Sequence, residues 1–178
     1  MNTLLLIGAV CLVLAIWAYN RLVALLNKVR TAWSDVDVQL QRRADLIPNL
    51  VTVVKQYADH EARTLEELTA RRARGGAINE AACQETAVSG GLLKLLAVVE
   101  SYPQLQADER FAALHQSLLQ VENDIQSARR YFNGATRDYN TLTEQFPWLL
   151  VARLCGFGHR EFFEIELATQ RAMPEVRL

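Results

Sequence analysis

The sequence predicts an all-α protein in which an N-terminal transmembrane helix continues into a bundle of long antiparallel amphipathic helices. Residues 3–19 contain no charged side chain and read TLLLIGAVCLVLAIWAY. Downstream of them, apolar residues recur at alternating steps of four and three along three long stretches. This spacing is typical of helices that pack against partner helices, and no strand-like alternation is seen. We therefore expect an anchor over 1–20, a bundle over 21–147 and a separate end over 148–178.

The uncharged stretch is 17 residues long. A helix of this length spans roughly 26 Å, near the lower limit for crossing a membrane. A cleaved signal peptide is the alternative, but it requires a basic start and small residues at its cleavage site. The start, MNT, has no basic residue, and the bulky Trp17 and Tyr19 spoil a cleavage site. Val10 also fits poorly before a lipoprotein cysteine at Cys11. We expect an uncleaved anchor with Trp17 and Tyr19 at the membrane interface.

The charge pattern bears on orientation and on partners. No basic residue precedes the anchor, whereas Arg21, Lys28 and Arg30 follow it. Because basic residues flank spans on the cytoplasmic side, this pattern favours a cytoplasmic C-terminal domain. The formal net charge of −1 gives no reason to expect a nucleic-acid partner. The cysteines form no evident disulfide framework, which agrees with a reducing compartment; they are Cys11, Cys83 and Cys155.

The first amphipathic helix is expected over 21–74, followed by the stop signal RGGA at 74–77. Its apolar stripe has two polar positions, Arg43 and Glu61. The stripe consists of Leu22, Leu26, Val29, Trp33, Val36, Leu40, Arg43, Ile47, Leu50, Val54, Tyr57 and Glu61.

Two further helices are expected, over 78–102 and 108–146. The stripe of the former is interrupted by Glu85, and Pro103 ends the helix. Asp108 is a suitable N-cap for the latter, because its carboxylate can accept hydrogen bonds from the first turn. The third stripe is apolar or aromatic throughout and consists of Phe111, Leu114, Leu118, Val121, Ile125, Ala128, Phe132, Ala135, Tyr139, Leu142 and Phe146.

The end of the chain, 148–178, comprises an apolar segment over 148–158 and a short C-terminal helix expected in the sequence HREFFEIELATQRAM. If each helix reverses the direction of the previous one, the third helix carries the apolar segment away from the membrane. We expect this segment to cap the bundle or to meet a partner.

The stretch RRADLIPNLV, 42–51, places charges and a proline inside the first stripe. Pro48 has no N–H and leaves the Ala44 carbonyl without its helical donor. Arg43 also occupies a stripe position that apolar residues fill on both sides. These features predict a kink between Ala44 and Pro48, with Arg43 or Asp45 paired to another helix or subunit.

Arg129 and Arg130 lie in the middle of the third helix. One interpretation is solvent exposure, with pairs such as Gln126 or Asn133 one turn away. The other is that one of them reaches a carboxylate on another helix, which would fix register more than it stabilises. The candidate carboxylates are Asp45, Glu61 and Glu100.

No pattern for metal, cofactor or catalysis is evident. His60 and Glu61 lack the second histidine that a zinc protease needs four residues later. The residue three before each histidine is not glutamate, so the di-iron pattern is also absent. No nucleophile elbow or phosphate-binding loop occurs. We therefore expect neither an enzyme nor a bound cofactor or metal.

From Tyr19 onwards the chain resembles the LemA family. The family's signature region is similar to YNRLVALLNKVRTAWSDVDVQLQRRADLIPNLVTVVKQYADHEARTLEELTAR. Its later blocks resemble LLAVVESYPQL, ARRYFN, DYN, FP and GF…FFE, in the same order. The resemblance implies a bacterial single-span membrane protein with long antiparallel helices and no established catalytic residues. Some relatives are associated with membrane protein quality control or organelle-like membranes. Phe132 departs from the family, which often has a tyrosine there.

By motif match, the resemblance points to a set of interaction or register candidates: Trp33, Asp37, Gln39, Arg42, Arg43, Asp45, Pro48, Asn49, His60, Glu61, Arg129, Arg130, Tyr131 and Asn133.

The combined interpretation is a single-pass protein of the bacterial inner membrane that acts as a scaffold or adaptor. The stripes have more apolar length than three unequal helices cover alone, so we expect a homo-oligomer. The lipid bilayer is one expected partner, and a membrane protein is another. The alternative is a regulatory partner of a membrane enzyme, such as a protease in envelope quality control. Its contact surface would lie in the tail, at Trp148, Phe157, Phe162 and Phe163.

Overall fold

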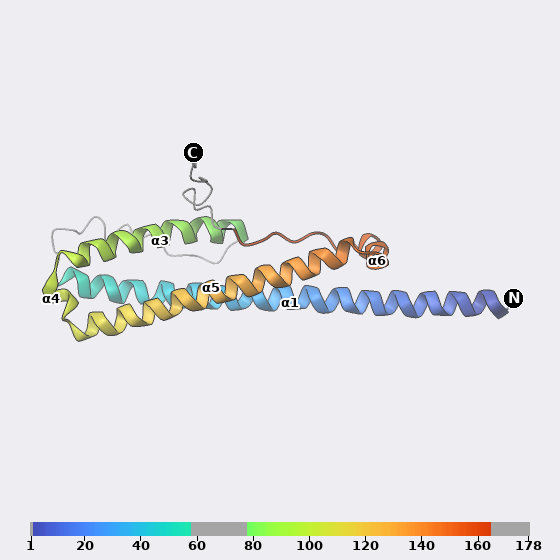
Figure 1. Cartoon of the computed structure of the whole chain (residues 1–178), viewed down its shortest axis with the longest axis horizontal. Helices are drawn as coiled ribbons and strands as arrows, with labels where there is room; N and C mark the ends of the chain where they lie inside the picture. Colours follow the sequence, from blue (N-terminus) through green and yellow to red (C-terminus); the bar gives the residue numbers. More distant parts are fainter. Residues whose placement is uncertain (1, 58–77, 165–178) are drawn as a thin grey trace, which may run out of the picture. The chain divides into compact units, whose positions relative to one another are not determined.

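The computed structural model describes residues 2–57 and 78–164, and every regular element within them is an α-helix (Figure 1). This confirms the all-α prediction, with a long apolar helix at the N-terminus followed by further helices. The elements are α1 (Asn2–Lys55), α3 (Ile78–Glu100), α4 (Pro103–Gln106), α5 (Glu109–Glu144) and α6 (Trp148–Cys155).

The chain divides into two compact units. The first unit comprises Met1–Val36 and Ser127–Phe162, and the second comprises Asp37–Gln126 and Phe163–Leu178. The helices α1 and α5 each contribute residues to both units.

In the first unit, α1 and α5 are antiparallel. The Lys28 ammonium lies 3.7 Å from the Asp138 carboxylate. Further along α1, the ring of Trp33 lies 5.4 Å from that of Phe132, centroid to centroid. Higher residue numbers on α1 therefore meet lower numbers on α5. Before Ala18 the side chains of α1 are exposed, and this part of α1 is long and apolar enough to cross a membrane.

In the second unit, α1, α3, α4 and α5 share one hydrophobic core. α3 leads into α4. The end of α1 lies beside the chain that follows α4, since the Tyr57 hydroxyl donates to Asp108, two residues after α4. Here α1 and α3 run in the same direction, and α5 runs back (Figure 1). The core contains Ile47, Leu50, Val51, Val54, Val88, Leu92, Leu95, Val99, Leu105, Phe111 and Leu118.

The apolar stripes are the surfaces that the protein buries. Every position of the first stripe up to Tyr57 is buried or half-buried, and so is every position of the third stripe up to Leu142. Phe146, the last position of the third stripe, is 75 % exposed. It lies beyond the end of α5 at Glu144, so the helical spacing no longer controls its direction.

The first stripe predicts a helix to residue 74, whereas α1 ends at Lys55. The backbone N–H groups of Gln56 and Tyr57 donate to the carbonyls three residues earlier, which tightens the chain into a turn. Residues 58–77 lie outside the described residues, and with them Glu61 and His60.

The helix α1 continues through Pro48 without a break. The Thr52 hydroxyl donates to the Pro48 carbonyl at 2.8 Å. The sequence also predicted that Arg43 or Asp45 pairs with another helix, and Arg43 forms an ion pair with Glu122 of α5.

The end of the chain differs from the expectation. The prediction that the apolar segment lies away from the anchor is wrong, since Trp148 and Phe157 contact Trp17 and Tyr19. That prediction assumed that each helix reverses the direction of the previous one. In the second unit, however, α3 runs in the same direction as α1. The short helix is α6, within the apolar segment, and residues 157–164 are not helical. The remainder of the helix expected in HREFFEIELATQRAM lies outside the described residues.

Candidate functional site

The most deeply buried charge among the described residues belongs to Arg43 in the second unit. Its side chain is 1 % exposed, and its Nη1 donates to Oε1 of Glu122 at 3.1 Å. The helical spacing of α1 turns Arg43 towards the core, between Leu40 and Ile47, which are both 5 % exposed. The contact bears out the prediction that Arg43 or Asp45 pairs with another helix, whereas Asp45 itself is exposed.

This ion pair fixes how α1 and α5 align in the second unit. A buried cation is costly unless it is paired and hydrogen-bonded. Sliding α5 by one turn, roughly 5.4 Å, would move Glu122 away from Arg43. The pair therefore penalises other alignments, which is the best-supported role of buried ionic groups in helical assemblies.

A second polar contact joins the end of α1 to the start of α5. Oδ1 of Asp108 accepts the backbone N–H groups of Arg110 at 2.7 Å and Phe111 at 3.1 Å, so Asp108 is the N-cap. Its Oδ2 accepts the Tyr57 hydroxyl at 2.9 Å. The Phe111 N–H and the Tyr57 hydroxyl hold the pKa of Asp108 below its ordinary value. The hydrogen bond to Asp108 raises the pKa of Tyr57.

In the first unit, an aromatic contact aligns the same two helices. Phe132 is 0 % exposed, and its ring is tilted by 59° to that of the half-buried Trp33. A tyrosine at position 132 would bring a hydroxyl into this contact. The phenylalanine brings only apolar surface, so the Trp33 contact depends on packing.

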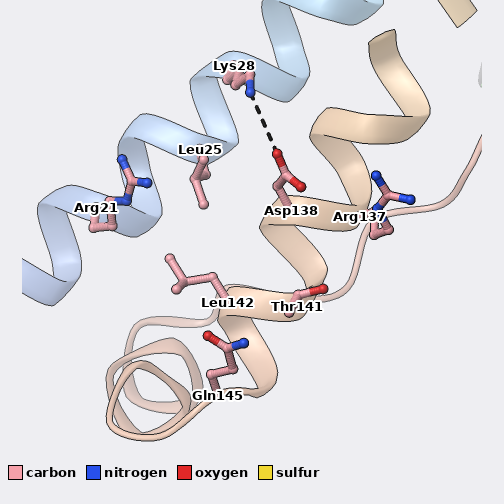
Figure 2. A pocket seen from close by; sticks show the side chains of 8 residues that line it. All are labelled: Arg21, Leu25, Lys28, Arg137, Asp138, Thr141, Leu142 and Gln145. Atoms are coloured by element: carbon pink, nitrogen blue, oxygen red, sulfur yellow. Dashed lines mark ion pairs between the residues drawn. The ribbon is translucent and has the colours of Figure 1, made fainter. Parts of the chain in front are cut away.

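A hollow of about 400 Å³ lies between α1 and α5 in the first unit, just beyond the apolar part of α1 (Figure 2). Leu25 and Leu142 point towards one another across it, and Lys28 is paired with Asp138. Its lining consists of Arg21, Leu25, Lys28, Arg137, Asp138, Thr141, Leu142 and Gln145.

The hollow carries a net positive charge. Within the described part of the chain, no hydrogen bond or ion pair engages Arg21 or Arg137, and both side chains are exposed. The Lys28–Asp138 pair cancels its own charge, which leaves the two guanidinium groups. Guanidinium groups bind phosphate and carboxylate through paired hydrogen bonds, so the hollow is suited to an anionic group.

Two neighbouring residues of α5 hold the chain after α6 in place. The Tyr139 hydroxyl donates to the Gly158 carbonyl at 3.1 Å. Asn140, 5 % exposed, donates to the Arg160 carbonyl at 2.8 Å and accepts the Arg160 N–H at 2.9 Å. Its amide also lies 3.4 Å from Nδ1 of His159. These bonds satisfy backbone groups that a helix through residue 160 would have paired internally.

The remaining candidates on α1, α3 and the adjoining chain are mostly exposed. Arg42 donates to Gln39 at 3.2 Å, a contact within one turn of α1. The exposed candidates are Asp37, Arg42, Asp45, Asn49 and Glu100. His60 and Glu61 lie outside the described residues.

The candidates in the middle of α5 face different surroundings. Arg130 is exposed and donates to Ser127 on the same helix at 3.2 Å. Tyr131 is exposed, and Nζ of Lys28 lies 5.7 Å from the centroid of its ring. Arg129 and Asn133 are half-buried.

The four tail aromatics expected to form a partner surface differ in exposure. Trp148 and Phe157 are half-buried against Trp17 and Tyr19, with ring centroids 5.6 and 5.7 Å apart. Phe162 is half-buried, and its ring meets that of His159 edge-on. Phe163 is only 1 % exposed, so this ring is not presented on the surface.

Sequence reasoning did not find Glu122, Tyr139 or Asn140 as contact residues, and it did not find Arg137 as a lining residue of the hollow. Glu122 adjoins the stripe residue Val121, and its importance depends on the register of α5. For Asn140 the sequence offers one indication of a contact, because Asn140 lies seven residues after Asn133 on the same helical face. Among residues 2–57 and 78–164, no cluster of three His, Cys, Asp or Glu side chains is arranged to hold a metal ion.

Comparison with known proteins places these features in a family. The model of the LemA family matches residues 32–178. The chain is similar to magnetosome protein MamQ of Magnetospirillum gryphiswaldense, at 27 % identity over 175 positions. It is also similar to magnetosome protein MamQ 2 of Paramagnetospirillum magneticum, at 27 % identity over 176 positions.

Both alignments cover 82 % of this chain and 64 % of the relative. The chain thus spans less than two thirds of the length of these relatives. The family match extends from the α1 stripe, one residue before Trp33, to the last residue of the chain. The chain therefore belongs to the LemA family.

Proposed function

We propose that this LemA family member is a membrane-anchored helical scaffold that self-associates. The observation that carries the proposal is the change in surroundings along α1. Its first part exposes apolar side chains almost everywhere, and its later part is buried along one stripe against α5. One unbroken helix thus joins a lipid-compatible segment to a packed helical domain.

The exposed apolar segment supports the anchor. Its large apolar side chains from Leu4 to Trp17 remain half to three-quarters exposed; examples are Leu4 at 74 %, Ile7 at 61 % and Val13 at 65 %. Water disfavours apolar surface by about 25 cal/mol per Å², so an uncovered segment of this length needs lipid or another apolar partner. Arg21, Lys28 and Arg30 are exposed after it and support a cytoplasmic domain in an inner membrane.

Large apolar side chains outside the segment support self-association. Val38 on α1, Leu93 on α3 and Leu119 on α5 are 52 %, 69 % and 51 % exposed. A second copy that covers them would remove this surface from water. Relatives of the chain are named as magnetosome proteins, after a cell structure and not after a reaction. Such names agree with a structural role.

The anchor is tested by washing membranes that contain the full chain with alkaline carbonate. We expect the chain to remain in the membrane and the double variant Leu4→Arg, Leu6→Arg to be released. The double variant Leu93→Arg, Leu119→Arg, which makes the same two changes at exposed positions of α3 and α5, is the matched control and should remain. Release of the unaltered chain would refute the anchor.

Self-association is tested by co-expressing full-length copies with two different tags and purifying one tag in mild detergent. We expect the second tag to co-purify, and light scattering to give the mass of more than one chain. A monomer mass at all protein concentrations would refute the scaffold. Photo-crosslinking from position 162 in cells distinguishes the scaffold from the regulatory alternative. A cross-link to a second copy of the chain supports the scaffold, whereas a cross-link to a membrane enzyme supports the regulatory partner.

A further inference from the structure

We propose that α6 lies on the membrane surface, with its exposed apolar face in the lipid interface. The inference rests on the proposed anchor. Two contacts within the first unit set the position of α6 along α1: Trp148 is 5.6 Å from Trp17, and Phe157 is 5.7 Å from Tyr19, between ring centroids. Trp17 and Tyr19 end the uncharged stretch, so α6 lies level with the end of the span.

The two faces of α6 have opposite surroundings. Trp148 and Ala152, four residues apart, turn inward, and Ala152 is 2 % exposed. Leu150 and Leu154, also four residues apart, turn outward and are 53 % and 86 % exposed. Residues four apart share a helical face, so the outward face is an apolar strip. Phe146, just before the helix, is 75 % exposed.

The direction of α6 suits a membrane surface. In Figure 1 the N-terminal part of α1 lies across the picture, whereas α6 is seen nearly end-on. The axis of α6 therefore crosses the direction of α1. A helix that crosses the direction of a span lies in the plane of the bilayer, as helices with one apolar face do at the boundary of headgroups and acyl chains.

Cations near α6 match the charge of phospholipid headgroups. Arg153 is exposed on α6, and Arg21 lines the basic hollow. From Trp17 to Arg21 the helix rises roughly 6 Å, about the thickness of one headgroup layer. Long basic side chains at this depth reach phosphates while their stems remain in apolar surroundings. The partner that the surface fits is thus a phospholipid bilayer with anionic headgroups.

The test uses the full chain with Cys11, Cys83 and Cys155 replaced by serine. A single cysteine is introduced as Leu154→Cys and carries a bimane fluorophore. The protein is reconstituted into vesicles of phosphatidylethanolamine and phosphatidylglycerol. Quenching is measured with iodide in the water and with brominated acyl chains in the bilayer. Ser117→Cys on α5, an exposed position outside the side chains proposed to meet a second copy, is the water control, and Leu12→Cys within the span is the lipid control.

We expect brominated lipid to quench the probes at positions 154 and 12, and iodide to quench position 154 several times less than position 117. A probe at 154 that iodide reaches as readily as at 117 would overturn the inference. Protection from both quenchers would also overturn it, because protein would then cover α6. If lipid fails to quench position 12, the anchor itself is refuted. Quenching at 12 but not at 154 refutes only the placement of α6.

Discussion

The Arg43 guanidinium and the Glu122 carboxylate form an ion pair whose two members have unequal surroundings. The arginine side chain is 1 % exposed, whereas the glutamate side chain is 28 % exposed. The arginine depends on the protein for its hydrogen bonds, and the glutamate has access to water. The consequences of altering the two residues therefore differ.

We expect Glu122→Leu to lower the free energy of unfolding by about 2 kcal/mol, because it removes an acceptor from a buried cation. The double variant Arg43→Met, Glu122→Leu should lose less than Glu122→Leu alone, since an apolar side chain then replaces the buried charge. Urea unfolding in detergent, followed by circular dichroism, measures both. A double variant that is less stable than the single variant would contradict this account.

The Lys28–Asp138 pair provides a matched comparison. Its atoms are 3.7 Å apart and its side chains are 42 % and 52 % exposed. Exposed pairs contribute little, so we expect Asp138→Asn to change the free energy of unfolding by less than about 1 kcal/mol. Added salt should reduce the change further. A loss as large as that of Glu122→Leu would show that exposure does not set the strength of these pairs.

Phe132 and its neighbour Tyr131 form a second comparison. Phe132 is 0 % exposed and Tyr131 is 51 % exposed. We expect Phe132→Ala to cost about 3–5 kcal/mol through lost burial and a cavity beside Trp33. Tyr131→Ala should cost about 0.5 kcal/mol or less. Equal losses in the same urea measurement would show that the Trp33 contact does not align the helices.

Asn140 should control the order of the chain after α6. Asn140→Ala removes the donor and the acceptor that hold the Arg160 backbone. We expect a loss of about 1–3 kcal/mol and faster hydrogen–deuterium exchange at residues 158–162. Arg137→Ala, at an exposed position of the same helix, is the control and should leave that exchange unchanged. Unaltered exchange in Asn140→Ala would contradict the proposed role.

The Asp108–Tyr57 contact predicts pH-dependent stability. The folded-state pKa of Asp108 is lowered by the Phe111 N–H and the Tyr57 hydroxyl. Its contribution is therefore complete above its unfolded pKa of about 3.9 and lost as pH falls through the lower folded value. The raised pKa of Tyr57 acts oppositely, contributing below about pH 10 and disappearing at higher pH. The urea concentration at the midpoint of unfolding is measured as a function of pH. In the Asp108→Asn variant this midpoint should fall less at acid pH than in the unaltered chain. An equal fall in both would exclude Asp108 as the cause of the acid-induced loss of stability.

The helical period predicts burial well, because it fixes which side chains share a face. It places Leu22, Val36 and Val54 in the core, and each is 0 % exposed. It also identifies Arg43 as a charge inside a stripe, which requires a partner. The identity of that partner depends on the register of α5, which no local pattern contains.

The end of α1 and the path of the tail depend on contacts distant in sequence. Lys55, Gln56 and Tyr57 carry no Gly or Pro stop signal, yet α1 ends there with Tyr57 bonded to Asp108. The place of Trp148 beside Trp17 likewise follows from the return of α5 along α1. Periodicity reports the buried faces of a helix but not the direction of the next helix.

The separation of Arg43 from Glu122 also bears on the order in which the chain folds during synthesis. The pair is 79 residues apart, and Tyr57 and Asp108 are 51 apart. At roughly 5–20 residues per second, Arg43 leaves the peptidyl-transferase centre roughly 4–16 s before Glu122 is added. Throughout that interval the stripe of α1 has no α5 to cover it. The nascent chain is therefore most vulnerable to aggregation before residues 109–144 emerge, when the apolar start of α1 has already been made.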